Sequence, residues 1–487
     1  MKLMCPTTRL ATLFFAFLLT LALTAGATAQ IKKKALPVKK PVAKKTIAKG
    51  KDAKKDSRKP TKKEELAKKN SKTGRDKASA KTKGTKKDTR NAKASSRDKD
   101  TKGSKKSRVE LRREAAERKA AEAVRLAAAL AEKRRREQAA REARERKLAF
   151  ERGLRNETAA NIANDNTDGE DPTIRAAAVN ALGNHAGTVV VMEAQTGKVL
   201  TIVNQDWAIR NSFKPCSTIK LVTGVGGLNE HVIEEGGTIR NSSGSMKLQD
   251  ALAFSNNGYF QRVGVNIGSS KMVEYAKELG LGERTGINAD GETPGRIPNG
   301  NNNPRIYSHG DDFEVTPLQL AVLVSALSNG GKKMVPQIPG PRIERSSFRP
   351  QVSGRIEVPK SVAEGMLPGM IGAAEYGTAR RGVDASMGVA GKTGSCIAKG
   401  SWVGLFASVA PVEDPKYSVV VITRGESERG KYAAAIAGKV YNALSSRIQR
   451  NPDKDLARRL RLEKSSVDAR TAAKMDEDED DADSPDR

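Results

Sequence analysis

The uneven distribution of charge most constrains what this chain can fold into. Residues 31–108 hold 32 Lys and Arg against 8 Asp and Glu, and large apolar side chains are almost absent from them. Such a segment cannot bury enough apolar surface to offset the conformational entropy lost on folding. We therefore predict that residues 30–108 form a disordered, self-repelling tether, so a hydrophobic core has to come from another part of the chain.

The N-terminus carries an apolar run at residues 10–23, which follows two basic residues. Small residues at 27–29 match what a signal peptidase requires. Residues 1–29 are therefore predicted to be either a cleaved export signal or an uncleaved membrane anchor that uses residues 10–26.

Residues 109–155 consist largely of Ala, Glu, Arg and Leu, with no Pro and no Gly before Gly153. These residue types favour one long charged helix. Its apolar residues are mostly Ala, which makes a thin seam for a coiled coil, although dimerisation through this helix stays open. A polar linker is predicted at 156–175, and the acidic residues 451–487 are predicted to be a disordered tail.

Residues 176–450 have the apolar content of an ordinary globular domain, so we expect the hydrophobic core to lie within them. Strand-like runs lie near both ends of this region, and helical patterns lie between them. The expected strands are 188–192, 198–203, two runs within 389–409, and 417–423, and the expected helices include 217–227, 246–267, 270–279, 317–328 and 433–446. A sheet then has to be assembled from distant segments, which predicts an α/β (α+β) fold.

A serine and a lysine three residues apart, Ser217 and Lys220, stand at the start of a predicted helix. Residues i and i+3 share one face of a helix, so the lysine amine would lie beside the serine hydroxyl. A serine hydroxyl needs a nearby base to act as a nucleophile, and a desolvated lysine amine can be that base. Alone, this spacing occurs by chance in many proteins.

Ser255 and Asn257 form a second polar pair, just before Gly258. Ser255 could relay a proton to a leaving group, and Asn257 could donate to an amide carbonyl of a substrate. A polar turn is the alternative interpretation, because Asn and Gly both favour turns.

A third element, Lys392-Thr393-Gly394-Ser395, lies in a predicted strand. Lys392 and Thr393 could hold a substrate carboxylate, and Gly394 would leave room for a substrate to pair along the strand. The N–H groups of Ser395 and Ser217 could stabilise an oxyanion. A turn that carries a lysine is the alternative.

In this order and at these spacings, the three elements resemble the signature of penicillin-binding proteins and serine β-lactamases: Ser-x-x-Lys, Ser-x-Asn and Lys-Thr-Gly. Residues 280–295 and 315–331, with Trp402 and Gly404, also resemble the transpeptidases of this superfamily. The resemblance implies an antiparallel sheet of about five strands flanked by helices, with an inserted helical subdomain. This sequence departs from the family pattern at Cys216, where members of the family often have glycine.

The resemblance implies a peptidoglycan D,D-transpeptidase in which Ser217 forms an acyl-enzyme with a D-Ala-D-Ala stem. An amine of another stem then receives the acyl group, and β-lactams trap the same serine. Such a substrate lies outside the cytoplasm, so we expect export, although the lysines from Lys32 onward favour the opposite location. No cofactor is implied, and His185, His231 and His309 are isolated in the sequence, which indicates no metal site.

Two cysteines remain once Cys5 is assigned to the signal. Cys216 precedes the nucleophile and Cys396 follows Ser395, and these segments are neighbours in the implied fold. Exported proteins meet an oxidising environment, so we predict a Cys216–Cys396 disulfide; the alternative is two buried thiols. A bridge in the same two places occurs in some carbapenem-hydrolysing class A β-lactamases.

Three other functions stay open. A class A β-lactamase would need a glutamate in a Glu-x-x-Leu-Asn context, whereas Glu292 is followed by Thr-Pro-Gly. A D,D-carboxypeptidase, which uses water as the acceptor, would carry the same motifs. A non-enzymatic wall-binding protein would act through the tether, whose charge suits an anionic wall polymer, a membrane surface or nucleic acid.

Overall fold

The predicted terminal segments lie outside the part of the chain that the structure describes. The structure, a computed structural model, describes residues 107–299, 302–340, 348–357 and 359–448. The predicted signal or anchor, the acidic tail and all but the last two residues of the tether fall outside these ranges. Within them, no helix is both long enough and apolar enough to cross a membrane.

Five antiparallel strands form the central sheet, in the order β2-β1-β7-β6-β5. Their bounds are β1 Gly187–Glu193, β2 Val199–Val203, β5 Ala390–Ala398, β6 Ser401–Ala410 and β7 Tyr417–Gly425. β1 pairs with β7, so that Val190 lies opposite Val420 and the two ends of the domain meet in one sheet. The predicted antiparallel sheet of about five strands is confirmed, and β5 is one of its edges.

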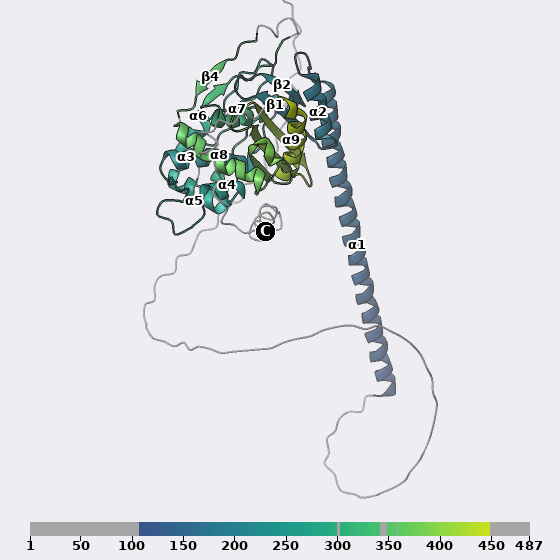
Figure 1. The fold of residues 1–487 in the computed structure, drawn as a ribbon. Helices are drawn as coiled ribbons and strands as arrows, with labels where there is room; N and C mark the ends of the chain where they lie inside the picture. Colours follow the sequence, from purple (N-terminus) through teal and green to yellow (C-terminus); the bar gives the residue numbers. More distant parts are fainter. Residues whose placement is uncertain (1–106, 300–301, 341–347, 358, 449–487) are drawn as a thin grey trace, which may run out of the picture. The chain divides into compact units, whose positions relative to one another are not determined.

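Helices cover both faces of this sheet (Figure 1). On one face, α2 (Pro172–Leu182) packs against β1 and β2, and α9 (Gly430–Leu444) packs against β5, β6 and β7. On the other face, α7 (Pro317–Ser328) packs against β1, β6 and β7. Because both faces are covered, consecutive residues 189–192 are all buried, which explains why β1 reads as a continuous apolar run.

The inserted helical part lies between β2 and β5 in the sequence. Its helices are α3 Lys220–Asn229, α4 Leu248–Ala253, α5 Asn257–Ile267, α6 Ser269–Glu278 and α8 Lys360–Glu375, with a small hairpin of β3 Lys332–Met334 and β4 Val352–Arg355. Short helical turns are η1 Asp206–Arg210, η2 Cys216–Ile219, η3 Pro304–Tyr307, η5 Ala385–Met387 and η6 Ser445–Arg447.

The single helix predicted at 246–267 is in fact two helices. The chain breaks at Ser255, whose φ of +58° is left-handed, and Asn256 then caps α5 by accepting a hydrogen bond from the Tyr259 N–H at 2.8 Å. An asparagine side chain satisfies the unpaired amides of a new helix start. The break places Ser255 and Asn257 at the junction of two helices.

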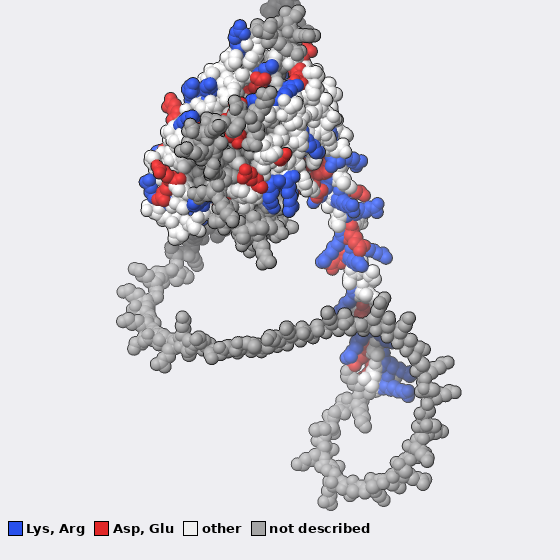
Figure 2. All heavy atoms as spheres, viewed as in Figure 1, with Lys and Arg blue, Asp and Glu red and all other residues white. Residues whose placement is uncertain are grey.

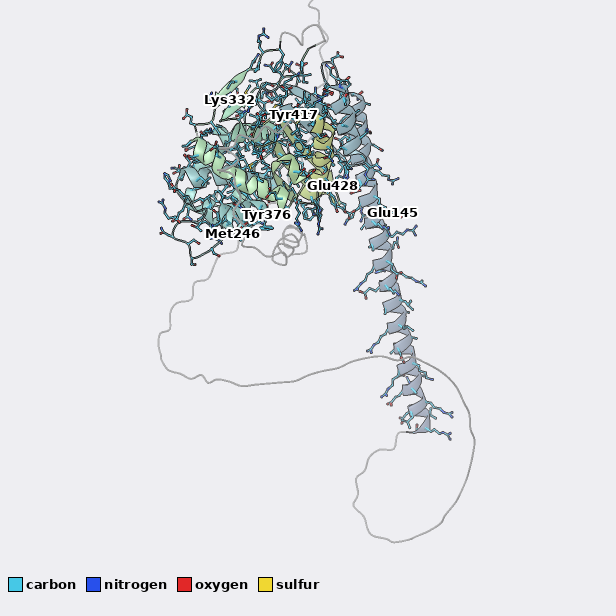
Figure 3. All side chains as sticks on the ribbon, in the orientation of Figure 1. Glu145, Met246, Lys332, Tyr376, Tyr417 and Glu428 are labelled. Atoms are coloured by element: carbon cyan, nitrogen blue, oxygen red, sulfur yellow. A yellow bond between two sulfur atoms is a disulfide. The ribbon has the colours of Figure 1, made fainter. Side chains whose placement is uncertain are left out.

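The charged helix is present as α1 (Arg108–Ala163) and begins with a capping box between Ser107 and Glu110. Of its side chains, only Leu154 and Thr158 are buried. Pairs four residues apart, such as Arg141–Glu145, link its surface, and both charge signs alternate along it (Figure 2). The side chains of α1, including Glu145, project into solvent over most of its length (Figure 3).

The C-terminal turns of α1 attach it to the sheet. Glu157 accepts a hydrogen bond from the Trp207 indole N–H at 2.9 Å, and Lys147 forms a 2.6 Å ion pair with Glu426. α1 therefore continues past Arg155, the end that the composition predicted, because these later turns pack on the domain.

The linker predicted at 156–175 is shorter than expected and belongs to the domain. Only residues 164–171 separate α1 from α2. They cover the outer edge of β2: Glu170 accepts from the Ile202 N–H at 2.9 Å, and the Asp171 N–H donates to the Leu200 carbonyl at 2.7 Å. The polar residues that predicted a linker therefore satisfy the hydrogen bonds of a sheet edge.

Candidate active site

An ion pair and two further hydrogen bonds to Asp311 hold the segment that precedes Ser217. Lys214 forms a 2.7 Å ion pair with Asp311, which also accepts hydrogen bonds from Asn303 and Arg305. Burial would raise the pKa of Asp311, but these partners outweigh it and hold the pKa below its ordinary value. The segment before the nucleophile is therefore fixed to the η3 region.

Cys216 adopts a left-handed backbone with φ of +48° immediately before Ser217. Side-chain-bearing residues seldom adopt this conformation, whereas glycine adopts it freely. A glycine, which the resemblance led us to expect at this position, would adopt this conformation without strain. The turn sends Ser217 and Lys220 inward, where they are 3% and 0% exposed.

The amine of Lys220 is the centre of the polar cluster. Its Nζ lies 2.9 Å from Ser217 Oγ, 2.7 Å from Ser255 Oγ, 2.6 Å from the Ser255 carbonyl and 2.7 Å from Asn257 Oδ1. The structure thus brings the first and second motifs together at one buried nitrogen.

β5 runs beside the nucleophile turn. A Cβ on Gly394 would lie only 3.2 Å from the Pro215 carbonyl and 3.3 Å from Cys216 Cβ, so a side chain there would crowd the turn. Lys392 is fully buried and its Nζ donates to the Thr393 carbonyl at 3.0 Å.

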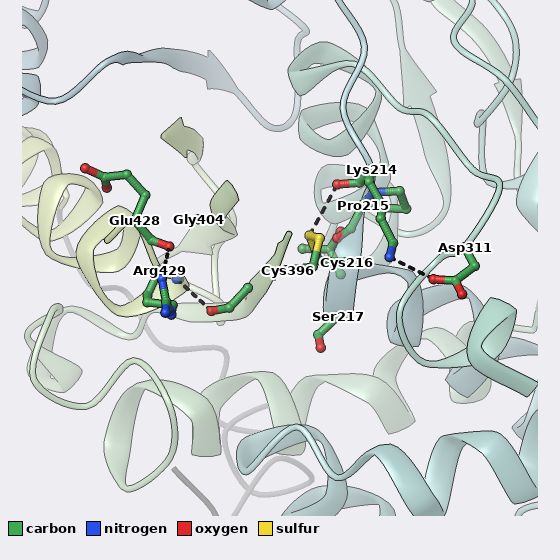
Figure 4. The surroundings of a disulfide bond; sticks show 12 residues. Lys214, Pro215, Cys216, Ser217, Asp311, Cys396, Gly404, Glu428 and Arg429 are labelled. Carbon is green, nitrogen blue, oxygen red and sulfur yellow. Dashed lines mark hydrogen bonds and ion pairs between the residues drawn. A yellow bond between two sulfur atoms is a disulfide. The ribbon is translucent and has the colours of Figure 1, made fainter. Parts of the chain in front are cut away.

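The predicted disulfide is present between Cys216 and Cys396, with a Cα–Cα distance of 5.6 Å. It joins the nucleophile turn to β5 and lies between Lys214 and Ser217 in the view of Figure 4. The bridge closes a loop with a sequence separation of 180 residues. In the chain-entropy model, a loop of that length stabilises the fold by up to about 5 kcal/mol.

Thr393 and Ser395 project from the same face of β5, because side chains alternate along a strand. Ser395 Oγ accepts from the Gly430 N–H at 2.9 Å, and Thr393 Oγ1 lies 2.6 Å from Thr378 Oγ1. Thr378 could not be singled out from the sequence, since a lone threonine between a helix and a strand belongs to no spacing pattern.

The histidines lie apart in the structure. Contact with Glu428 at 2.7 Å raises the pKa of His185, while His309 Nδ1 lies 2.7 Å from Ser308 Oγ. Among the residues described, no group of three or more His, Cys, Asp or Glu could hold a metal ion.

Comparisons with known proteins identify a matching family and several relatives of this chain. The family described as "Penicillin binding protein transpeptidase domain" matches residues 187–444. The chain is 28% identical over 291 residues to peptidoglycan D,D-transpeptidase MrdA of Haemophilus influenzae, covering 48% of this chain and 44% of that protein. It is 26% identical over 317 residues to peptidoglycan D,D-transpeptidase FtsI of Escherichia coli, covering 54% and 51%.

A solved structure of Pseudomonas aeruginosa PBP2 in complex with WCK 5153 is 22% identical, with a TM-score of 0.49, and covers 56% of this chain and 74% of that one. The chain spans about half the length of the two curated relatives named above.

Proposed function

We propose, because the chain belongs to the family of penicillin binding protein transpeptidase domains, that it cross-links peptidoglycan through an acyl-enzyme at Ser217. The donor would be a D-Ala-D-Ala peptide stem and the acceptor an amine of a second stem. The observation that carries the proposal is the buried amine of Lys220, which contacts Ser217 and the Ser255–Asn257 pair together.

The amine of Lys220 lies within hydrogen-bond distance of two groups that can only accept and of two hydroxyls. The Ser255 carbonyl and Asn257 Oδ1 can only accept hydrogen bonds, so each takes one N–H of the amine. In its neutral form the amine keeps one lone pair, and we propose that this lone pair accepts the proton of Ser217. Lys220 in this form would take the Ser217 proton as Oγ attacks the carbonyl carbon. Ser255 would then give its own proton to the amine that leaves when the C–N bond breaks, and would take the proton held by Lys220 in its place.

The β5 side of the site supports charge stabilisation. The N–H groups of Ser217 and Ser395 are the proposed donors to the oxyanion, because the disulfide and Gly394 keep these two segments adjacent. The hydroxyls of Thr393 and Ser395, near buried Lys392, are the proposed site for the terminal carboxylate of the stem.

Glu292 does not favour the class A β-lactamase alternative. Its carboxylate accepts from the Thr285 N–H at 2.7 Å, the Thr285 hydroxyl at 2.6 Å and the Gly286 N–H at 3.1 Å. Both oxygens of the Glu292 carboxylate therefore accept hydrogen bonds from a neighbouring loop, which indicates a structural role for Glu292 and not the activation of a water molecule. A D,D-carboxypeptidase would share every group named here except the acceptor.

Mass spectrometry after incubation with benzylpenicillin tests the proposal. We expect a penicilloyl adduct on the peptide that contains Ser217, no adduct with Ser217→Ala, and acylation about 10²- to 10⁴-fold slower with Lys220→Met, which lacks the base. An unmodified wild-type Ser217 would overturn the proposal.

A fluorescent penicillin and a synthetic stem separate the alternatives. A label that persists for many minutes supports a transpeptidase or a carboxypeptidase, whereas rapid turnover supports a β-lactamase. Cross-linked product from the stem and an amine acceptor supports transfer, and D-Ala release without cross-linking supports hydrolysis.

We also propose that the site works outside the cytoplasm, since peptidoglycan stems lie there. The charge of residues 31–108 suits an anionic wall polymer or a lipid surface as a partner for the tether.

A further inference from the structure

The two hydroxyls on β5 that are proposed to bind the carboxylate, those of Thr393 and Ser395, each have a hydrogen-bond partner within the protein. The Gly430 N–H donates to Ser395 Oγ at 2.9 Å, which leaves the proton of Ser395 directed elsewhere. Thr393 Oγ1 lies 2.6 Å from Thr378 Oγ1, in a bond whose donor the distance does not determine. A Cβ on Gly430 would lie 2.8 Å from Thr393 Cβ, so the start of α9 packs directly against these hydroxyls.

We propose that Thr378 is a positioning residue that donates its proton to Thr393 and so directs the proton of Thr393 to the terminal carboxylate of the substrate. This inference rests on the proposed function, which assigns the carboxylate to Thr393 and Ser395. A hydroxyl has one proton and a carboxylate only accepts. If Thr393 donates to the carboxylate, the proton in the 2.6 Å bond has to come from Thr378.

A hydroxyl that accepts one hydrogen bond becomes a better donor in the next, because successive hydrogen bonds polarise each other. Thr378 would thereby do for Thr393 what the Gly430 N–H does for Ser395. The two hydroxyls would both present protons to the carboxylate without first having to rotate, which lowers the entropy lost on binding.

The backbone around Thr378 is fixed against the second motif. The Thr378 N–H donates to the Ala253 carbonyl at 3.0 Å, and Ala253 lies two residues before Ser255. A Cβ on Gly377 would lie 2.2 Å from the same carbonyl, so only glycine allows this approach. The Tyr376 hydroxyl donates to Asp250 Oδ1 at 3.1 Å, and the Tyr376 ring contacts Phe254; Asp250 lies in α4 and Phe254 directly follows it.

Thr378 therefore joins the end of α4, which leads to Ser255, to the strand that carries Thr393. Its hydroxyl contacts the group that would bind the carboxylate and none of the groups around Lys220. Loss of the hydroxyl should weaken recognition of the carboxylate selectively, whereas general damage to the site would slow acylation by every β-lactam.

The test compares acylation rates of wild type, Thr378→Val and Thr378→Ser with benzylpenicillin and with its methyl ester. Valine keeps the shape and removes the hydroxyl, while serine keeps the hydroxyl. For the free acid, we expect Thr378→Val to be slower by about tenfold and Thr378→Ser to stay within about threefold of wild type. For the ester, which has no charge to bind, we expect Thr378→Val to stay within about twofold of wild type.

The outcomes separate the two proposals. Absence of a Ser217 adduct in wild type overturns the proposed function and this inference with it. An acylated wild type with an unchanged Thr378→Val rate on the free acid overturns the inference alone. An equal loss on acid and ester also overturns it, since Thr378 would then support the fold of the site, and thermal unfolding of each variant identifies that case.

Discussion

The left-handed backbone at Cys216 links the stability of the site to a single residue. Its φ of +48° is unfavourable for a residue with a side chain, and its disulfide to Cys396 holds the turn against β5. Such strain tends to lie at functional sites, where the surrounding structure imposes it. Ser255, which also contacts Lys220, has the same kind of left-handed backbone, with a φ of +58°.

Two replacements of Cys216 separate the contribution of the disulfide to stability from the contribution of the strained backbone. Cys216→Gly and Cys216→Ser both remove the disulfide, but only glycine relieves the left-handed conformation. We expect the free energy of unfolding, measured by urea denaturation, to be higher for Cys216→Gly than for Cys216→Ser by about 1 kcal/mol. Both should be less stable than oxidised wild type, typically by about 2–4 kcal/mol.

Cys396→Ser is the matched control, because it removes the bridge and keeps a side chain at 216. It should resemble Cys216→Ser. A glycine variant no more stable than the serine variant would show that the positive φ contributes nothing measurable.

The sequence indicated most of the residues in the site and few of their contacts. Ser217, Lys220, Ser255, Asn257 and Lys392 stand at recurring spacings, so they could be singled out. That Lys220 touches both serines and Asn257 depends on the fold, as does the bond from Thr378 to Thr393. No local pattern connects two threonines that belong to different elements.

At the scale of elements, prediction succeeded where an apolar run was bounded by clear helix start and stop signals. Residues 317–328 are apolar and capped by Thr316 and Gln319, and α7 has those bounds. α8 was missed, because Gly365, Pro368 and Gly369 inside it look like helix breakers. Its burial against α4 compensates for those residues, and such tertiary contacts are invisible in a single segment.

The two halves of α1 should respond differently to substitution. Ala128 lies in the exposed half, whereas Leu154 is buried at 6% exposure against the domain. We expect Ala128→Pro to lower the helical signal in circular dichroism and to leave the unfolding free energy of the domain within about 0.5 kcal/mol. Leu154→Ala should lower that free energy by about 2–3 kcal/mol.

Benzylpenicillin acylation gives a second readout for this pair. Ala128→Pro should acylate at the wild-type rate, since the exposed half of α1 is far along the helix from the turns that pack on the sheet. Domain destabilisation by Ala128→Pro equal to that of Leu154→Ala would contradict the division of α1 into an exposed and an anchored half.

At the scale of the whole molecule, α1 raises the question of self-association. Its large exposed apolar side chains are Val109, Leu111, Val124, Leu126, Leu130, Leu148 and Phe150. No large apolar residue lies between 111 and 124 or between 130 and 148. A coiled coil needs apolar positions every 3.5 residues on average, so these gaps leave no continuous seam for a second copy.

We therefore expect the chain to be monomeric in light scattering at physiological salt, with α1 acting as a spacer of about 1.5 Å per residue. Residues 109–155 carry 15 Lys and Arg against 9 Asp and Glu, so two copies aligned in parallel would repel each other. Raising the salt to about 0.5 M screens that repulsion, and the monomer should persist, because the described surface of α1 offers no continuous apolar seam for pairing. A dimer that disappears when residues 108–146 are deleted would contradict this prediction and would show that α1 pairs through its charged residues instead.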